Sequence, residues 1–252
     1  MAVNPFSLEG RTALVTGANT GIGQGIAVGL AQAGADIIAM GRSAPTETAA
    51  RVEALGRRFT AVSADFGSTA PIPAAVEQAF AAGEIDILIN NAGTIRRGDA
   101  LTFTEEDWDA VIDTNLKSVF FLSQAVARRW ADAGRGGKIV NIASMMSFQG
   151  GIRIASYTAA KSGLAGLTKL LANEWAGRGI NVNAIAPGYF ATNNTAALQA
   201  DETRNRDILA RIPAGRWGEP ADLAGAAVFL ASRASDYMHG AIVPVDGGWL
   251  AR

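Results

Sequence analysis

The chain has 252 residues, of which 49% are hydrophobic and 18% are charged, and this composition favours a single α/β domain with a large buried core. Its 22 basic and 23 acidic residues give a net charge of -1, which argues against nucleic acid as a partner. With no cysteine and one histidine, His239, the chain lacks the residues for disulfides, thiolate nucleophiles or a multi-histidine metal site.

The N-terminal segment, residues 1–10, lacks the basic region and apolar run of a secretory signal. No apolar run in the chain approaches the roughly 20 residues that a membrane span needs. We therefore expect a cytoplasmic protein with no membrane partner.

Short runs rich in β-branched residues alternate with longer segments whose apolar residues recur every three to four positions. The short runs predict strands at 12–16, 36–40, 59–63, 85–90, 138–143, 181–186 and 241–245. The longer segments predict helices at 22–33, 46–55, 72–82, 105–130, 156–176 and 220–230. This alternation predicts one domain, residues 1–252, with a doubly wound parallel sheet of about seven strands and helices on both faces.

The segment 187–213 interrupts this alternation, because it is polar, poor in β-branched residues and without a clear period. Most connections in α/β domains are much shorter, and one of this length is usually a functional lid or a partly helical insertion. We expect a substrate lid at about 188–213, with a plain surface excursion as the alternative.

The first predicted strand runs into the segment TGANTGIG at 16–23, and a predicted helix follows at once. Gly17, Gly21 and Gly23 allow the backbone to turn tightly and to approach a pyrophosphate at the helix N-terminus. Three residues separate the first two glycines, so the spacing differs from the usual dinucleotide fingerprint. A simple turn is the alternative, but the first strand-to-helix junction of a doubly wound sheet favours a nucleotide.

Two further strand ends belong to the same crevice. Asp65 follows the third strand and can accept a hydrogen bond from an adenine amino group, while the segment NNAG at 90–93 follows the fourth strand. Asn and Asp used as turn formers are the alternative.

Tyr157 and Lys161 are four residues apart in a predicted helix, so they lie one turn apart on the same face. The pKa of a tyrosine is about 10, and a nearby ammonium lowers it toward the range of acid-base catalysis. Ser144 follows the fifth strand and can hold a substrate oxygen, and the amide of Asn115 can fix a water next to Lys161. These four residues fall on elements whose ends are expected to converge on the crevice.

As a set, these motifs resemble those of the short-chain dehydrogenase/reductase family over nearly the whole chain. The resemblance rests on the glycine motif at 16–23, Asp65, the motif at 90–93, the four residues just described, and Pro187-Gly188 followed by Thr192. It implies a Rossmann-type fold, a NAD or NADP cofactor, hydride transfer to or from a carbonyl or hydroxyl group, and a homotetramer.

The resemblance also implies roles for individual residues: Tyr157 as acid-base, Lys161 binding the nicotinamide ribose and lowering the tyrosine pKa, Ser144 orienting substrate and Asn115 supporting a proton relay. The residues that we expect at the cofactor are Gly17, Asn19, Thr20, Gly21, Ile22, Gly23, Arg42, Asp65, Phe66, Asn91, Ala92, Gly93, Tyr157, Lys161, Pro187, Gly188 and Thr192.

Within the family, the segments 90–97, 148–153 and 245–252 resemble the 2-dehydro-3-deoxy-D-gluconate 5-dehydrogenases, also called 2-deoxy-D-gluconate 3-dehydrogenases. This implies a keto-deoxy sugar acid from uronic-acid polymers such as pectin and alginate, and related enzymes reduce 4-deoxy-L-erythro-5-hexoseulose uronate. A carboxylated substrate needs a cation, preferably a guanidinium. Arg153 is the first candidate, Arg96 and Arg97 are close seconds, and Arg252 is either a ligand of a neighbouring subunit's site or a solvated terminus. The residues that we expect at the substrate are Arg96, Arg97, Ser144, Met146, Gln149, Arg153 and Tyr157.

Several alternatives stay open. The substrate can be another carbonyl compound, such as a 3-oxoacyl thioester or a neutral sugar, and a non-catalytic cofactor-binding sensor is an alternative of another class. The cofactor preference is also open, because no carboxylate follows the second strand to bind ribose hydroxyls, and Arg42 can hold a 2′-phosphate there. The subfamily resemblance points to NAD, whereas the residues favour tolerance of NADP.

Overall fold

The parallel sheet expected from the sequence is present in the computed structural model, which describes residues 4–252. The first three residues of the segment 1–10 therefore lie outside the described residues. Within 4–252, seven parallel strands form one sheet in the order β3-β2-β1-β4-β5-β6-β7. Their bounds are β1 (Thr12–Thr16), β2 (Asp36–Gly41), β3 (Phe59–Ser63), β4 (Ile87–Asn90), β5 (Gly137–Ile142), β6 (Ile180–Pro187) and β7 (Ile242–Val245). The expected doubly wound fold is confirmed.

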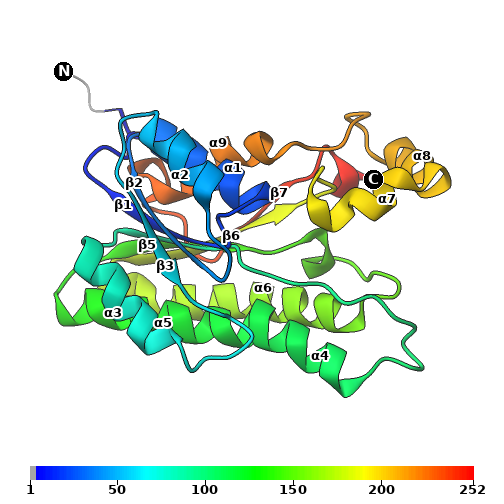
Figure 1. Cartoon of the computed structure of the whole chain (residues 1–252), viewed down its shortest axis with the longest axis horizontal. Coiled ribbons are helices and arrows are strands. Elements are labelled where there is room, and N and C mark those ends of the chain that lie inside the picture. Colours follow the sequence, from blue (N-terminus) through cyan, green and yellow to red (C-terminus); the bar gives the residue numbers. More distant parts are fainter. Residues whose placement is uncertain (1–3) are drawn as a thin grey trace.

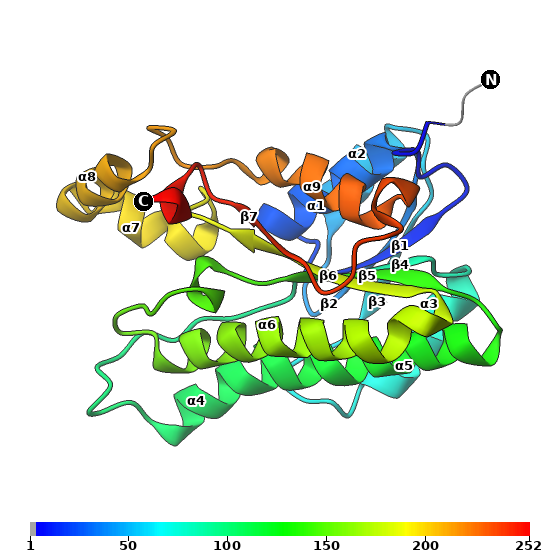
Figure 2. The same ribbon diagram turned by 180° about the vertical axis from the view of Figure 1, so that it is seen from behind.

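Helices cover both faces of this sheet (Figures 1 and 2). One face carries α1 (Gly21–Gln32), α2 (Thr46–Glu53) and α9 (Ala224–Ala231). The other carries α3 (Ile72–Ala82), α4 (Glu105–Ile112), α5 (Ser118–Asp132) and α6 (Ala155–Trp175). Two short helices, α7 (Ala196–Ala200) and α8 (Glu202–Arg211), lie together beyond the carboxyl end of β6, beside the end of the chain.

The strands consist mostly of apolar residues because helices cover both faces of the sheet. Successive side chains of β1 point to opposite faces, so Val15 packs in the cluster that contains Ile26 of α1 and Leu14 packs in the cluster that contains Trp130 of α5. All five residues of β1 are buried. This two-sided burial fixes the register of the central strand and holds its carboxyl end in place.

The strand order reverses beside β1, because β1 pairs with β2 on one edge and with β4 on the other. The chain therefore leaves β1 in one direction and later returns to its other side. In open parallel sheets the crevice at such a reversal, outside the carboxyl ends of the strands, is where ligands bind. The residues that follow β1 and β4 thus face each other across this crevice.

The helix expected at 105–130 is interrupted, which the apolar spacing did not predict. A π-helical segment, η1 (Asp113–Lys117), separates α4 from α5, and such segments are frequent at functional sites. The helix expected at 220–230 begins as a 3₁₀ turn, η5 (Pro220–Leu223). The segment 188–213 is partly helical, because it contains α7 and α8, and its role as a substrate lid stays a prediction. Among residues 4–252, no helix is both long enough and apolar enough to cross a membrane.

Candidate active site

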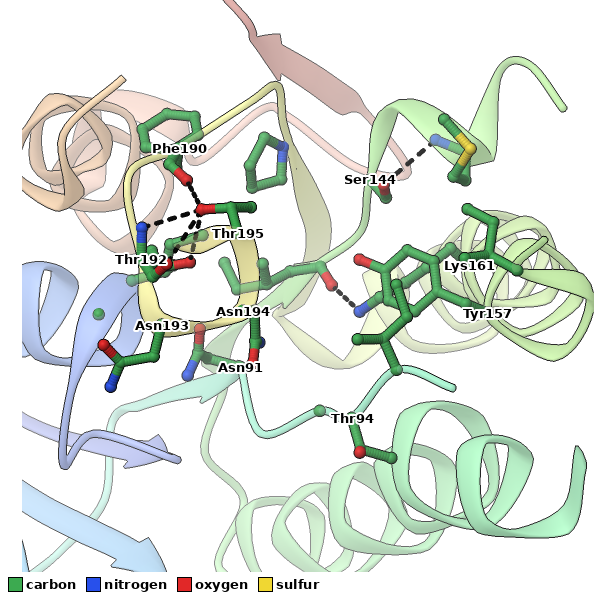
Figure 3. Close-up of a pocket in the computed structure, with 18 of the residues that line it drawn as sticks. Asn91, Thr94, Ser144, Tyr157, Lys161, Phe190, Thr192, Asn193, Asn194 and Thr195 are labelled. Carbon is green, nitrogen blue, oxygen red and sulfur yellow. Dashed lines mark hydrogen bonds between the residues drawn. The ribbon is translucent and has the colours of Figure 1, made fainter. Parts of the chain in front are cut away.

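A cavity of about 1360 Å³ opens at the carboxyl ends of the strands, between the loops that follow β1, β4 and β5 and the helices α7 and α8. Every site residue predicted from the sequence lines this cavity except Asn115, which is fully buried behind it. Figure 3 shows Ser144, Tyr157 and Lys161 on one side and the segment 190–195 on the other. The fold thus gathers segments from the whole chain, because the lining extends from Gly17 to Trp249.

The loop between β1 and α1 is shaped by glycine. Gly17 and Gly21 have φ angles of 64° and 55°, which favour glycine over other residues. A Cβ atom on Gly23 would lie 2.2 Å from the carbonyl oxygen of Gly17. The helix N-terminus that follows has no side-chain cap at Thr20 and no acidic residue in its first turn, so its free N–H groups face the cavity uncompensated. The loop is therefore a cradle for an anionic group.

The two strand ends of the crevice are joined by side chains of Thr16 and Asn91. The Asn91 amide donates to the carbonyl oxygens of Thr16 and Gly17 at 2.9 and 3.1 Å. The Thr16 hydroxyl accepts from the backbone N–H groups of Asn91 and Ala92, each at 2.9 Å. Asn91 thus lines the cavity and also fixes the glycine loop, a structural role that the sequence did not indicate.

The adenosine end of the predicted cofactor site contains Arg42 and Asp65. Their side chains form a loose ion pair at 3.7 Å, and the arginine side chain is 80% exposed. Asp65 also accepts the backbone N–H of Gly67 at 3.0 Å. The guanidinium therefore lies beside the group predicted to contact the adenine, and most of its surface remains open.

Tyr157 and Lys161 lie one turn apart near the start of α6, as their spacing predicted. The lysine is only 5% exposed, and its Nζ donates to the carbonyl oxygen of Ile142 at the end of β5, at 2.6 Å (Figure 3). The same Nζ lies 5.7 Å from the centre of the Tyr157 ring. This arrangement holds the ammonium at a fixed place beneath the phenol.

The electrostatics of this pair differ from the sequence-based expectation. Burial raises the pKa of Tyr157 above its usual range, while a hydrogen bond to Ser144 and the charge of Arg97 act in the lowering direction. Burial also lowers the pKa of Lys161 to about 8. The pKa of Tyr157 is therefore not lowered, as had been expected from Lys161, because the effect of desolvation is larger than that of the nearby charges. Desolvation also disfavours the charged form of Lys161.

Ser144 caps the short 3₁₀ turn η2 (Met145–Ser147) that follows β5. Its hydroxyl accepts the backbone N–H of Met146 at 3.2 Å, and the residue is 8% exposed. Because the hydroxyl accepts that bond, its own proton remains free to be donated into the cavity. The geometry therefore offers a donor beside the Tyr157 hydroxyl.

Asn115 lies in the π-helical segment, and its amide is used by the backbone of Thr94. The side-chain oxygen accepts the Thr94 N–H, and the side-chain nitrogen donates to the Thr94 carbonyl, both at 2.8 Å. The amide thereby fixes the loop that follows β4, and a water held by it next to Lys161 stays a prediction. That loop carries Arg96 and Arg97.

The three candidate arginines have different surroundings. Arg96 pairs with Asp107 at 3.2 Å, which directs its charge to α4. Arg97 donates through Nη2 to the carbonyl oxygen of Asn194 at 3.2 Å. Arg153 is exposed, has a φ of 61° in the left-handed region, and forms no side-chain hydrogen bond or ion pair within residues 4–252. All three line the cavity, but only Arg97 bridges its two walls.

The described part of the cavity carries an excess of positive charge. Its lining has four more cationic than acidic side chains, in a chain whose net charge is -1. The cations are Arg42, Arg96, Arg97, Arg153, Lys161, Arg204 and Arg211, and the carboxylates are Asp65, Asp201 and Asp207. Such a concentration of one charge favours anionic ligands.

The substrate side of the cavity includes residues that the sequence did not predict. Trp249 is buried in an apolar cluster with Met145 and Met146, and the guanidinium of Arg211 lies 4.0 Å from the centre of its ring. Arg204 and Arg211 lie on α8 and are seven residues apart, which places them on the same face of that helix. This spacing is the signal in the sequence that could have identified both as cavity residues.

Arg252 contacts α8 of its own chain. Its guanidinium donates to the carbonyl oxygens of Ala210 and Arg211, at 2.6 and 3.3 Å, at the end of α8 of the same chain. The side chain is therefore held against the end of α8 although the residue is exposed, and a role at a neighbouring subunit's site stays a prediction. His239, the one histidine, contacts Asn181 and does not line the cavity.

Comparison with known proteins finds a family model and similar proteins that match nearly the whole chain. A family model described as enoyl-(acyl carrier protein) reductase matches residues 17–250. The 2-dehydro-3-deoxy-D-gluconate 5-dehydrogenase of Escherichia coli (strain K12) is 62% identical over 253 residues, covering 100% of both chains. A solved structure from Agrobacterium tumefaciens with bound NADP is 62% identical with a TM-score of 0.94, covering 99% of this chain and 100% of that chain. A gluconate 5-dehydrogenase from Burkholderia cenocepacia J2315, in complex with NADP and tartrate, is 42% identical with a TM-score of 0.93, covering 98% of each chain.

Proposed function

The chain belongs to the short-chain dehydrogenase/reductase family and is an NAD(P)-dependent oxidoreductase, and we propose that its substrate is a keto-deoxy sugar acid. The class comprises 2-dehydro-3-deoxy-D-gluconate and 4-deoxy-L-erythro-5-hexoseulose uronate. The observation that carries the proposal is the excess of positive charge around Tyr157, which suits a carboxylate and leaves a neutral sugar without ionic partners. The similarity to sugar-acid dehydrogenases supports it.

The residues present fit a nicotinamide dinucleotide. A Cβ atom on Gly17 or Gly23 would press against Asn91, Ala92 or the loop itself, so these glycines allow the loop to pack closely against the end of β4. The uncapped start of α1 then supplies N–H donors for a pyrophosphate. Gly17, Gly21 and Gly23 would hold the pyrophosphate, Arg42 and Asp65 the adenosine end, and Lys161 the nicotinamide ribose. When bound, the dinucleotide supplies or accepts the hydride.

Within this proposal Tyr157 moves the proton at the substrate oxygen. In the reducing direction its phenol is protonated at neutral pH, because burial raises its pKa, and it donates that proton to the developing alkoxide. In the oxidising direction it must first lose the proton, and the ammonium of Lys161 stabilises the resulting phenolate. The carbonyl of Ile142 keeps Lys161 in place for that task.

Ser144 and Asn115 act at the two ends of this proton path. The Ser144 hydroxyl donates to the substrate oxygen and stabilises its negative charge in the transition state. Asn115 acts through its two hydrogen bonds to the backbone of Thr94, which fix the cavity wall opposite α6. The π-helical turn leaves backbone groups without regular helical partners, and these can support a water on the way to Lys161.

Three further parts of the proposal concern the whole molecule. Residues 188–213 act as the substrate lid of the single domain 1–252, supported by the cavity face of α8. The protein is a homotetramer in the cytoplasm. The exposed apolar side chains of Phe121 on α5 and Leu170 on α6 support the association of subunits. Light scattering of the purified protein tests the tetramer directly.

The function is tested by measuring the oxidation of NADPH and NADH with a panel of ketones. The panel contains a keto-deoxy sugar acid, the matched neutral keto sugar and a 3-oxoacyl thioester. We expect the sugar acid to have the highest kcat/KM. The variant Tyr157→Phe should keep its cofactor affinity and lose turnover by roughly 10²- to 10⁴-fold, since it lacks one transferable proton. A higher kcat/KM for either other ketone would refute the proposed substrate.

A further inference from the structure

Two neighbouring arginines in the loop after β4 have opposite surroundings. Arg96 donates to Asp107, to the Thr94 hydroxyl at 3.0 Å and to the Ile95 carbonyl at 3.3 Å. Arg97 makes one hydrogen bond, to the carbonyl oxygen of Asn194 at 3.2 Å, and no ion pair within residues 4–252. Since a guanidinium has five N–H donors, Arg97 retains an uncompensated charge and most of its donors.

The loop that carries Arg97 is fixed on both sides of this residue. On one side, the Asn115 amide makes two bonds to the backbone of Thr94. On the other side, the N–H of Gly98 donates to the carbonyl oxygen of Arg153 at 3.0 Å, which joins the loop to the segment before α6. The backbone position of Arg97 is therefore set by hydrogen bonds on both sides of the residue, as recognition of a small ligand requires.

Arg97 also faces the reacting centre. Arg97 and Tyr157 line the same cavity, and the charge of Arg97 acts on the Tyr157 hydroxyl in the direction that lowers its pKa, although burial has the larger effect and keeps that pKa raised. Arg153 is exposed like Arg97 but forms no side-chain hydrogen bond within residues 4–252, and Arg211 is stacked on Trp249. Of the cations that line the described cavity, Arg97 is thus the one that reaches both the acid-base residue and the segment 193–195.

Asn194, which accepts the hydrogen bond from Arg97, belongs to a turn that is held by several hydrogen bonds. The Thr195 hydroxyl donates to the carbonyl of Phe190 at 2.6 Å and accepts the N–H of Thr192 at 3.1 Å (Figure 3). This turn, η4 (Asn193–Thr195), leads directly into α7 and α8. A contact at Asn194 therefore acts on the start of the whole segment that covers the substrate side of the cavity.

We propose that Arg97 is the specificity-determining residue for the substrate carboxylate, and that the same guanidinium holds the covering segment closed through Asn194. This inference rests on the proposed sugar-acid function and adds which cation performs the recognition. A guanidinium can offer two parallel N–H groups to a carboxylate while a third donates to a carbonyl oxygen. One residue thereby couples recognition of the acid to closure of the site.

The test compares three variants, Arg97→Gln, Arg97→Lys and Arg96→Gln, with the wild-type enzyme. The substrates are the keto-deoxy sugar acid and its uncharged primary amide. We expect Arg97→Gln to lower kcat/KM for the acid by roughly ten- to a hundred-fold, mainly through KM, and to leave the amide almost unchanged. Arg97→Lys should recover part of the loss. Equal losses in Arg97→Gln and Arg96→Gln, or equal losses for acid and amide, would overturn the assignment.

A second measurement is independent of turnover. Calorimetry with the NADP-loaded protein measures the binding of D-gluconate, and hydrogen exchange follows the backbone amides of 193–200. We expect gluconate to bind and to slow exchange in the wild-type protein, and both effects to be lost in Arg97→Gln. Unchanged binding by this variant would overturn the inference even if its turnover fell.

The two measurements separate the inference from the function on which it rests. If the wild-type enzyme reduces the sugar acid and Arg97→Gln is not selectively impaired, the inference fails and the function stands. If the wild-type enzyme reduces no sugar acid but binds gluconate through Arg97, the function fails and the carboxylate site stands. If it neither reduces a sugar acid nor binds gluconate, both are overturned.

Discussion

The cofactor side and the substrate side of the cavity are built in different ways. The cofactor side consists of strand ends and the glycine loop, joined by backbone-directed bonds such as those of Asn91. The substrate side consists of the loop before α6, the segment 188–213 and the end of the chain, joined by side chains such as Arg97, Arg211 and Arg252. A site fixed by backbone geometry accepts one ligand shape, whereas a site closed by side chains can change its specificity through single substitutions.

The largest expected effect comes from comparing the same substitution, glycine to alanine, on the two sides of the cavity. The variant Gly23→Ala would place a Cβ atom against the Gly17 carbonyl oxygen, and the loop must shift. Overpacking of this kind costs roughly 1 to 3 kcal/mol, and the displaced donors should weaken dinucleotide binding by about a hundred-fold. Fluorescence titration with NADPH measures the loss.

The matched control for that variant is Gly150→Ala in the loop before α6. A Cβ atom at Gly150 meets no atom within 4 Å, and the residue does not have a positive φ. Its cofactor affinity and thermal stability should therefore match those of the wild-type protein. Similar losses in both variants would contradict the distinction between a rigid and an adaptable side.

The next effect concerns a proposed cofactor contact that an exposed side chain supplies. If Arg42 binds a 2′-phosphate, Arg42→Ala should weaken NADPH about tenfold, the low end for a charge-assisted bond, because the side chain is largely exposed. NADH should be unaffected. Dissociation constants for both cofactors, measured on both proteins, give the answer, and an equal change in the two would exclude phosphate recognition by Arg42.

Lys161 lies between the two sides, and its lowered pKa predicts how activity depends on pH. The reducing direction needs a protonated Lys161 and a protonated Tyr157, and burial places the lysine pKa at about 8. The kcat/KM for ketone reduction should therefore be constant below pH 8 and fall about tenfold per unit above it. A profile that stays flat to pH 10 would show that the bound cofactor restores the ordinary lysine pKa.

The lowered pKa of Lys161 also makes the folding stability depend on pH. Because the folded pKa of Lys161 is about 8 and the unfolded value is 10.5, the unfolded chain binds more protons between these values. The cost of burying the ammonium is therefore fully present below pH 8 and is relieved as the pH rises toward 10.5. Relative to Lys161→Met, the wild-type protein should gain free energy of unfolding across this range, by an amount on the order of 3 kcal/mol. Urea denaturation at a series of pH values measures it.

The smallest effect concerns the closure of the substrate side. Arg252→Ala removes a cation from the carbonyl oxygens at the end of α8, an interaction of about 0.3 to 1 kcal/mol. The KM for the sugar acid should rise about two- to fivefold, with unchanged NADPH affinity. The control is Arg233→Ala, an exposed arginine that does not line the cavity. A parallel fall in cofactor affinity would show that the end of the chain supports the whole cavity and not α8 alone.

The sequence by itself determined the sheet, the glycine cradle and the acid-base pair. These features depend on local order: a strand followed at once by glycines and a helix, and two residues spaced by one helical turn. Their geometry follows from backbone rules that do not depend on distant contacts, so residue spacing was enough to place Gly23, Tyr157 and Lys161.

Only the tertiary structure decided the charges and the closure of the site. The pKa values of Tyr157 and Lys161 depend on how deeply the whole fold buries them, and the sequence-based estimate had counted the nearby charge without the desolvation. The choice among Arg96, Arg97 and Arg153 depends on whether a partner such as Asp107 already pairs with the guanidinium. Contacts of this kind join residues that are far apart in the chain, and no local pattern encodes them.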